Sequence, residues 1–213
     1  MLNSATLTHL LPGPAGLIEV AVDRPSTGAA HAGVALIAHP HPLYGGTMHN
    51  KVVQTLARAF VQVGWEAVRF NFRGVGKSEG SHDNGQGEVD DWLFLLEQMA
   101  PQGPIAVAGF SFGAYITAAG LARVNPARAP EHIVLVGTAA SRFAVPPIAS
   151  EWHERTLVVH GEVDDTVPLS AVIDWARPQN LPVTVVPGVE HFFHGQLGLL
   201  KSLVLRQLQQ HPR

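Results

Sequence analysis

The sequence alternates short, nearly continuous apolar runs with longer stretches in which apolar residues recur every three or four positions. Such runs are typical of strands in a parallel sheet, because crossover helices cover both faces of that sheet. The alternation of strands and helices in turn indicates βαβ units with right-handed crossovers. We therefore expect an α/β fold with an open, mostly parallel central sheet flanked by helices. The strands are expected at 17–22, 34–38, 65–70, 105–109, 133–136, 157–159 and 183–186.

Five helical patterns lie between or after these strands. The first runs from Met48 to Val63, with Thr47 as a candidate N-cap. The second begins near Val89 and is stopped by Pro101. The remaining helices are expected at 114–122, 169–176 and 195–208.

Composition limits the class of protein. The 213 residues and 22.8 kDa are the size of one domain, so we expect residues 1–213 to form a single unit. The absence of cysteine excludes disulfides and a thiol nucleophile. A net charge of −3 without a basic stripe argues against a nucleic-acid partner. No apolar run approaches the ~20 residues of a membrane span, and residues 1–16 lack the features of a secretory signal. We therefore expect a cytoplasmic protein with no membrane partner.

The pentapeptide Gly109-Phe110-Ser111-Phe112-Gly113 matches G-x-S-x-G, the pattern of a nucleophile elbow. An apolar run leads into it and a helical pattern follows, so we expect Ser111 on a sharp, strained turn that exposes its hydroxyl. The two glycines fit because backbone segments approach closely at such a turn. A serine here could instead be only a helix N-cap. The glycines and the flanking elements favour the nucleophile.

A serine hydroxyl needs a base, and the base needs an orienting carboxylate. In sheets of this kind the acid and the histidine follow the serine in chain order, each after a later strand. Asp164 follows the sixth expected strand and is the candidate acid, with Asp165 and Glu162 as competitors. His191 follows the last strand and is the candidate base, whereas we interpret His194 as a surface residue or a neighbour that supports the site without taking part in catalysis.

The backbone is expected to supply an oxyanion hole. One donor would be the N–H of Phe112, and the second would come from the loop 39–46 after the second strand. The two prolines of this loop have no N–H to donate. The remaining candidates are His41, Leu43 and Tyr44, of which we favour Leu43.

The same loop raises the alternative of a metal site. His39-Pro40-His41 has the His-x-His spacing found in some metal hydrolases, and acidic and histidine residues after later strands could complete a ligand set. This hypothesis leaves the serine pentapeptide unexplained. We therefore expect no metal and no cofactor.

Residues 74–78, Gly-Val-Gly-Lys-Ser, end like a phosphate-binding loop. That pattern requires a glycine where this chain has Asn71, and a helix directly after the loop, which the sequence does not indicate. We interpret the stretch as a surface turn beside the site.

Taken together, the chain resembles an α/β-hydrolase, specifically the small bacterial hydrolases without a lid that are related to dienelactone hydrolase and carboxylesterases. The resemblance covers about residues 34–195 and implies Ser111 as nucleophile, Asp164 as acid and His191 as base. Dienelactone hydrolases themselves use a cysteine nucleophile, which this chain lacks. The segments that carry the resemblance are His39-Pro40-His41-Pro42 with Gly45-Gly46 and 50–53, 71–76 with Ser78 and Gly80, 109–113, Gly161 with Asp164, Val167 and Pro168, and 191–195.

We therefore predict a serine hydrolase, a carboxylesterase that acts on small-molecule esters with short or accessible acyl groups. Only about twenty residues join the fifth and sixth strands, too few for a lid. An acyltransferase or peptidase with the same residues, and a metal-dependent hydrolase using His39 and His41, are the alternatives. The edge strands of such a sheet could also pair two copies into a homodimer. The expected open bowl is lined by Leu43, Tyr44, Phe110, Phe112, Phe143 and Phe192.

Overall fold

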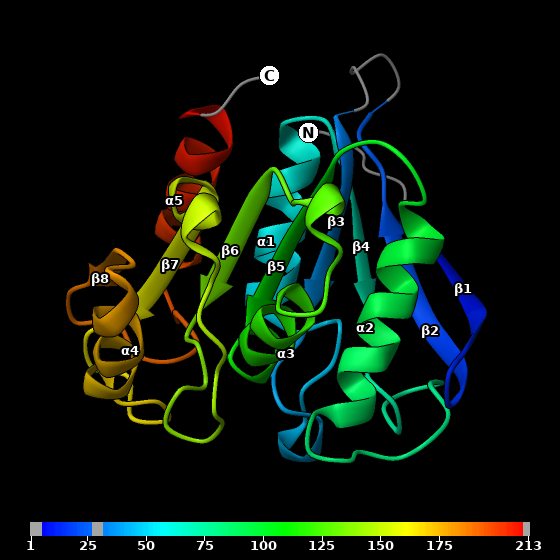
Figure 1. Ribbon diagram of the computed structural model, residues 1–213, viewed down its shortest axis with the longest axis horizontal. Coiled ribbons are helices and arrows are strands. Elements are labelled where there is room, and N and C mark those ends of the chain that lie inside the picture. The colour runs from blue at the N-terminus through cyan, green and yellow to red at the C-terminus, as the bar shows by residue number, and fades with distance from the viewer. Residues whose placement is uncertain (1–5, 27–31, 211–213) are drawn as a thin grey trace.

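A computed structural model describes residues 6–26 and 32–210 (Figure 1). Its sheet has eight strands in the order β1-β2-β4-β3-β5-β6-β7-β8. Strands β3 to β8 are parallel, whereas β1 and β2 are antiparallel to their neighbours. The expected mostly parallel α/β sheet is therefore confirmed. The strands are β1 Thr6–Gly13, β2 Gly16–Asp23, β3 Gly33–Ala38, β4 Trp65–Phe70, β5 Ile105–Phe110, β6 His132–Val136, β7 Thr156–Gly161 and β8 Val183–Val186.

Helices cover both faces of the sheet (Figure 1). Residues of α1 and α5 share one buried cluster with one face, and residues of α2, α3 and α4 share the other cluster with the opposite face. Neighbouring residues of β5 belong to different clusters, since Ala106 and Ala108 pack toward α1 while Val107 packs toward α2 and α3. This two-sided burial explains the continuous apolar runs. The helices are α1 Lys51–Gln62, α2 Gln86–Met99, α3 Phe112–Leu121, α4 Leu169–Ala176 and α5 Leu197–Gln210.

The first strand was not predicted. β1 forms a hairpin with β2 through the turn at Gly13 and Gly16, and none of its eight residues is buried. A strand at an exposed edge is under no pressure to alternate apolar and polar residues, so it carries no clear period-2 pattern. Residues 1–16, which were expected to lack a secretory signal, include this strand. Residues 1–5 of that segment lie outside the described part of the chain.

The N-cap of α1 was predicted three residues too early. Asn50 is the cap, since its Oδ1 accepts a hydrogen bond from the N–H of Val52 at 2.9 Å. Thr47 instead accepts from the N–H of His49 at 3.2 Å, in a turn before the helix. Both side chains are good N-caps, so the sequence alone did not distinguish them.

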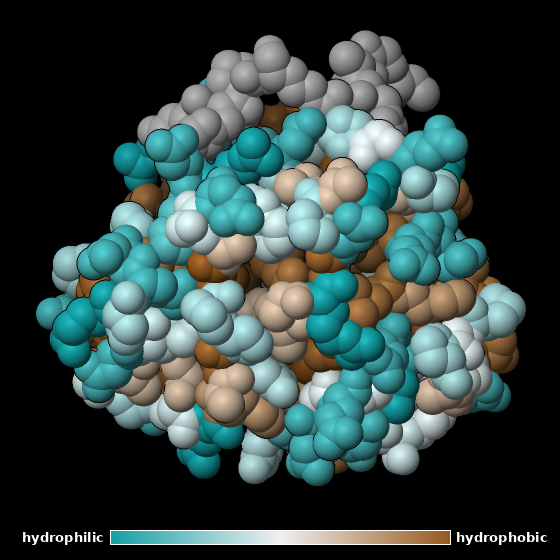
Figure 2. Space-filling model, in the orientation of Figure 1, coloured by the Kyte–Doolittle hydropathy of each residue, from teal (hydrophilic) through white to brown (hydrophobic). Residues whose placement is uncertain are grey.

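The loops that follow the parallel strands gather at the carboxyl ends of these strands, which the arrowheads mark in Figure 1. Ser111 follows β5, Asp164 follows β7, and His191 follows β8. The connection from β6 to β7 contains a single short 3₁₀ helix, Ser150–Arg155, and no lid. In Figure 2, hydrophobic residues on the drawn face lie mainly in recesses between polar ones. No helix among residues 6–26 and 32–210 is long and apolar enough to cross a membrane.

Candidate active site

Ser111 occupies the sharp turn between β5 and α3. Its φ of 57° and ψ of −115° are strained for an L-residue, and its N–H donates to the carbonyl of Val136 at 2.8 Å. A side chain at Gly109 would come within 2.2 Å of the carbonyl oxygen of Gly113. One at Gly113 would come within 2.3 Å of that of Ala38. The G-x-S-x-G spacing is therefore required by the close approach of three backbone segments.

Three side chains form a hydrogen-bonded chain at this turn. His191 Nε2 lies 3.0 Å from Ser111 Oγ, and His191 Nδ1 lies 2.6 Å from Asp164 Oδ2. An ionised carboxylate can only accept, so Nδ1 carries the proton and Nε2 is free to accept one from the hydroxyl. The three residues are only 2–7% exposed. The structure thus brings together the serine, histidine and aspartate that the sequence singled out.

The carboxylate of Asp164 is held from its other side by backbone. Its Oδ1 accepts hydrogen bonds from the N–H groups of Thr166, at 3.0 Å, and Val167, at 2.7 Å. This leaves Oδ2 directed at the imidazole. Asp165, the nearest competitor in sequence, is exposed and accepts only from the hydroxyl of Thr166 among the described residues.

The loops after β7 and β8 are bonded to each other. The N–H of Val163 donates to the carbonyl of Val189 at 3.1 Å, and the N–H of Gly188 donates to the Glu162 carboxylate at 2.8 Å. The loops also touch closely, because a side chain at Gly161 would lie 2.3 Å from the oxygen of Val189. Glu162, a competing candidate acid, therefore connects the two loops that carry the acid and the histidine.

The imidazole of His191 rests against the end of β6. A Cβ at Gly137 would lie 3.1 Å from Cε1 and 3.3 Å from Nδ1 of the ring, and Gly137 has a φ of 55°. On another side, the ring of Phe110 packs on the imidazole with centroids 4.9 Å apart. Sequence reasoning did not identify Gly137, because its role depends on a residue more than fifty positions away.

The histidine loop is anchored at two more points. Phe193 is buried with a φ of 56°, so its ring reaches the core while the chain turns sharply. Glu190 accepts from the N–H groups of Phe192, at 2.8 Å, and His194, at 2.7 Å. Partial burial alone would raise the pKa of Glu190, but these hydrogen bonds and the nearby His194 and His191 side chains together lower the pKa. The side chain of His194 is 72% exposed and pairs with Glu190, in keeping with its interpretation as a surface residue.

His39 fixes the start of the loop after β3. Its Nδ1 lies 2.6 Å from the carbonyl of Pro40, and its Nε2 accepts from the N–H of Phe72 at 3.0 Å. Burial lowers the pKa of this imidazole to about 3, so it is neutral at ordinary pH. Both nitrogens are occupied, which removes His39 from the ligand set of the metal hypothesis. No cluster of three metal-binding side chains occurs among the described residues.

The hydrogen bonds of this loop do not favour Leu43 as an oxyanion donor. The N–H of Leu43 donates to His41 Nδ1, and that of Tyr44 donates to the His41 carbonyl, both at 3.2 Å. Within residues 6–26 and 32–210, the N–H groups of His41 and Phe112 make no hydrogen bond. The latter lies in the first turn of α3, whose N–H groups have no partner within the helix. These two are therefore the better candidate pair.

The prediction of which residues line the open bowl was partly wrong. Phe110 and Phe112 are 0% and 1% exposed, because they pack beneath the site rather than line it, while Phe143 is partly buried. Large apolar side chains are instead exposed on the loops that carry the site, and we call this group the apolar rim. It comprises Leu43 (70% exposed), Tyr44 (85%), Val163 (55%) and Phe192 (42%).

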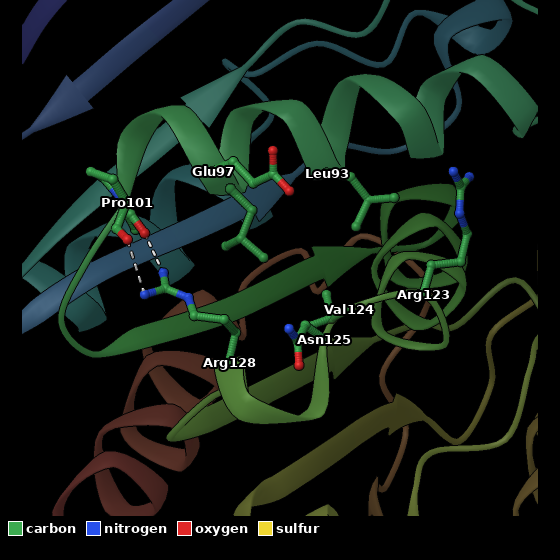
Figure 3. A pocket seen from close by; sticks show the side chains of 9 residues that line it. Leu93, Glu97, Pro101, Arg123, Val124, Asn125 and Arg128 are labelled. Carbon is green, nitrogen blue, oxygen red and sulfur yellow. Dashed lines mark hydrogen bonds between the residues drawn. The ribbon is translucent and has the colours of Figure 1, made fainter.

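A cavity of about 470 Å³ lies elsewhere, between α2 and the segment after α3 (Figure 3). Leu93 and Glu97 approach it from α2, and Arg128 closes one end by donating to the carbonyls of Ala100 and Pro101. It contains none of the candidate site residues.

Comparisons with known proteins agree with this architecture. The family described as "Serine aminopeptidase, S33" matches residues 31–163. XC6422 from Xanthomonas campestris, described as an α/β serine hydrolase without a lid, is 35% identical with a TM-score of 0.83, over 99% of this chain and 96% of that one. An α/β serine hydrolase homologue from Coxiella burnetii is 40% identical with a TM-score of 0.77, over 98% of each chain.

A curated relative, an uncharacterized protein from Rickettsia prowazekii, is 44% identical over 108 residues, which are 49% of this chain. The match spans 44% of that protein, so this chain covers less than half the length of the curated relative. The family match includes more than half of the chain and the solved relatives are similar over nearly all of it. The chain therefore belongs to the serine aminopeptidase S33 family of hydrolases and has an α/β-hydrolase fold without a lid.

Proposed function

We propose that this protein is a carboxylesterase that cleaves small-molecule esters through a serine acyl-enzyme. The observation that carries the proposal is the continuous hydrogen-bonded chain from Ser111 through His191 to Asp164. A serine on a strained turn, a histidine with its acceptor nitrogen 3.0 Å away, and a buried carboxylate behind it have the geometry of a catalytic triad.

In the first half of the reaction, Ser111 Oγ attacks the ester carbonyl carbon while His191 Nε2 takes the hydroxyl proton. The tetrahedral intermediate collapses, and the imidazolium gives that proton to the departing alkoxide, which leaves as the alcohol. In the second half, His191 takes a proton from water, and the resulting hydroxide attacks the acyl-enzyme. The proton then returns to Ser111 Oγ as the acid product leaves.

Two kinds of group stabilise the charges that develop. Asp164 holds the proton of His191 on Nδ1 and stabilises the imidazolium. The N–H groups of Phe112 and His41 donate to the oxyanion in our assignment, and the N-terminus of α3 adds its positive dipole end. Because such donors act where the charge forms, each is expected to contribute about 10²–10³ in kcat.

The apolar rim suggests which esters fit. Four large apolar side chains, exposed on the loops that carry the candidate site residues, offer contact area to the acyl or alcohol part of a substrate. Without a lid to enclose a long chain, this surface suits short or sterically accessible acyl groups.

A peptidase is the second candidate, because the family that matches is described as a serine aminopeptidase. An aminopeptidase needs a carboxylate for the free amino group of its substrate. Glu190, next to the histidine, already accepts from the backbone N–H groups of Phe192 and His194, and its carboxylate lies 3.0 Å from Nδ1 of the His194 ring. Hydrolysis rates for p-nitrophenyl butyrate and aminoacyl p-nitroanilides separate the two activities, and product analysis with a competing alcohol detects acyl transfer.

The proposal is tested with Ser111→Ala and a p-nitrophenyl ester. We expect turnover to fall on the order of 10⁶-fold while the far-UV circular dichroism spectrum stays unchanged. Ser202→Ala, at an exposed serine of α5, is the matched control and should retain wild-type turnover. An Ser111→Ala protein with wild-type turnover would refute the proposal.

A further inference from the structure

His160 is a polar residue where the sheet is otherwise apolar. It lies in β7 after Val158 and Val159, with 0% exposure, and its Nδ1 is buried without a hydrogen-bond partner among the described residues. A buried polar atom left unpaired costs about 1–3 kcal/mol. A valine or leucine at this position would avoid that cost, so the rest of the side chain must make a compensating interaction.

The other nitrogen makes that interaction. His160 Nε2 lies 2.9 Å from the carbonyl oxygen of Val167, which can only accept, so Nε2 carries the proton. Burial lowers the pKa of His160, which leaves Nδ1 unprotonated and the ring neutral. The same Nε2 lies 3.5 Å from Asp164 Oδ2, too far for a full hydrogen bond but close enough for its N–H dipole to attract the carboxylate.

These contacts form a closed ring around the acid. His160 Nε2 donates to the carbonyl of Val167, and the N–H of Val167 donates to Asp164 Oδ1 at 2.7 Å. Asp164 Oδ2 then faces both His160 Nε2 and His191 Nδ1, the latter at 2.6 Å. Val167, whose N–H orients one carboxylate oxygen of Asp164, is thus itself held through its carbonyl by the imidazole that faces the other oxygen.

We propose that His160 is a positioning residue that holds Asp164 against His191, through its hydrogen bond to Val167 and the approach of its Nε2–H to Asp164 Oδ2. This inference rests on the proposed serine-hydrolase function. His160 does not reach Ser111 or exchange a proton in the reaction. It keeps the loop after β7 in the one conformation in which Oδ2 lies in line with Nδ1.

Loss of the contacts of His160 with Val167 and Asp164 should lower kcat more than it weakens substrate binding. A displaced carboxylate stabilises the imidazolium less, and a misplacement of about 1 Å can cost about 100-fold in rate. The substrate contacts no part of the ring, so KM should change little. Among the described residues, the charged or titratable groups that act on His191 are Asp164 from the loop after β7, His160 from β7 itself, and Glu190 from the histidine's own loop.

The test compares three substitutions at His160 in the full chain, with a p-nitrophenyl ester as substrate. His160→Phe removes the donor while keeping the ring; we expect kcat to fall about tenfold to 100-fold with KM within twofold. His160→Gln retains an N–H donor near the place of Nε2 and should keep most of kcat, whereas His160→Asn, whose amide is too short to reach Val167, should resemble His160→Phe. The matched control is His132→Phe, a buried histidine at the opposite end of neighbouring β6, which should keep wild-type kcat.

A pH profile and a double-mutant cycle separate positioning from general damage to the fold. In His160→Phe the acid limb of the kcat/KM profile should move to lower pH, because the imidazolium has lost stabilisation.

Asp164→Asn alone should cost about 10⁴ in kcat, and adding His160→Phe should cost nothing further, because His160 acts through Asp164. Wild-type kcat in His160→Phe and His160→Asn, or effects that multiply in the double variant, would overturn the inference. Full activity in Asp164→Asn would instead overturn the proposed function.

Discussion

At the scale of single residues, the candidate site depends on positions where any larger or differently shaped side chain would move a reacting group. Gly137 is the clearest. The residue before it, Val136, accepts from the N–H of Ser111, and Gly137 itself faces the imidazole of His191. The end of β6 thus sets the distance between the serine and the histidine without contributing a functional side chain.

Gly137→Ala should therefore reduce activity. The new Cβ would lie 3.1 Å from Cε1 of His191, and the φ of 55° costs an alanine about 1–2 kcal/mol of stability. We expect kcat/KM for a p-nitrophenyl ester to fall at least about tenfold. Gly103→Ala is the control: its φ is 80°, but nothing lies within 4 Å of the added Cβ. It should lose similar stability in a urea titration and retain activity. Equal activity in both variants would contradict this role of Gly137.

Candidate site residues could be predicted from the sequence where the order of strands along the chain limited the choice. Ser111, Asp164 and His191 each follow a strand, and the order of strands along the chain fixes which loops meet. The role of Gly137 was not predictable, because it is defined by a contact with His191, which is distant in sequence. The role of His160 was not predictable either, because its contacts with Val167 and Asp164 depend on how the loop after β7 folds back. Leu43 was favoured as a donor for a related reason: no pattern in the sequence reveals that the His41 imidazole occupies its N–H.

At the scale of elements, caps and loop-to-loop bonds determine where the site-bearing segments begin. Helix α1 starts directly after the loop 39–46 and the turn that follows it, so its N-cap sets the end of that segment. Asn50 provides the cap by accepting from the N–H of Val52.

Asn50→Ala should destabilise the protein by about 1 kcal/mol, because the first turn of α1 loses a hydrogen-bond acceptor. Urea unfolding followed by circular dichroism measures this difference. Thr47→Ala, at the position favoured by the sequence pattern, should cost less because Thr47 serves only a turn outside the helix. A larger loss in Thr47→Ala than in Asn50→Ala would mean that the cap has been assigned to the wrong residue.

The elements themselves were largely predictable. Seven of the eight strands were expected, and five of these gave the nearly continuous apolar runs that two covered faces require. β1 was missed because an exposed edge strand is not selected for such a run. Helix ends were less predictable than helix centres: α5 begins at Leu197, two residues after the expected start, and α3 begins at Phe112, directly after the serine. Local side-chain and backbone hydrogen bonds decide these ends, and they depend on conformation rather than on hydrophobic period.

At the scale of the whole molecule, the buried neutral histidines couple stability to pH. Burial lowers the pKa of His39 from 6.5 to about 3, so between these values the unfolded chain takes up a proton that the folded chain does not. Stability therefore falls as the pH decreases through this window. His39 alone should remove about 2 kcal/mol of unfolding free energy between pH 7 and pH 5.

Urea titrations at pH 7, 6 and 5 measure this loss. His39→Gln retains an acceptor for the N–H of Phe72 but cannot titrate, so we expect it to be less stable than the wild type at pH 7 and to lose less stability on acidification. Parallel pH dependence in the two proteins would show that His39 does not contribute to the effect.

The absence of a lid also has a consequence for the whole molecule. A lipase-like enzyme opens a lid at a lipid surface, whereas here the nucleophile lies among loops with an exposed apolar rim. We expect rates on p-nitrophenyl esters to be highest for acetyl and butyryl groups and to show no jump when a substrate forms micelles. A marked preference for long acyl chains, or a jump at the critical micelle concentration, would contradict the open site.

The central claim is that Ser111 is the nucleophile, activated by His191 with Asp164 behind it. Labelling of the full chain with a fluorophosphonate, followed by peptide mass mapping, tests it most directly, because this reagent requires an activated serine. We predict one modified residue, Ser111, and loss of labelling in His191→Ala. Label on a different serine, or none on the folded wild-type protein, would contradict the account.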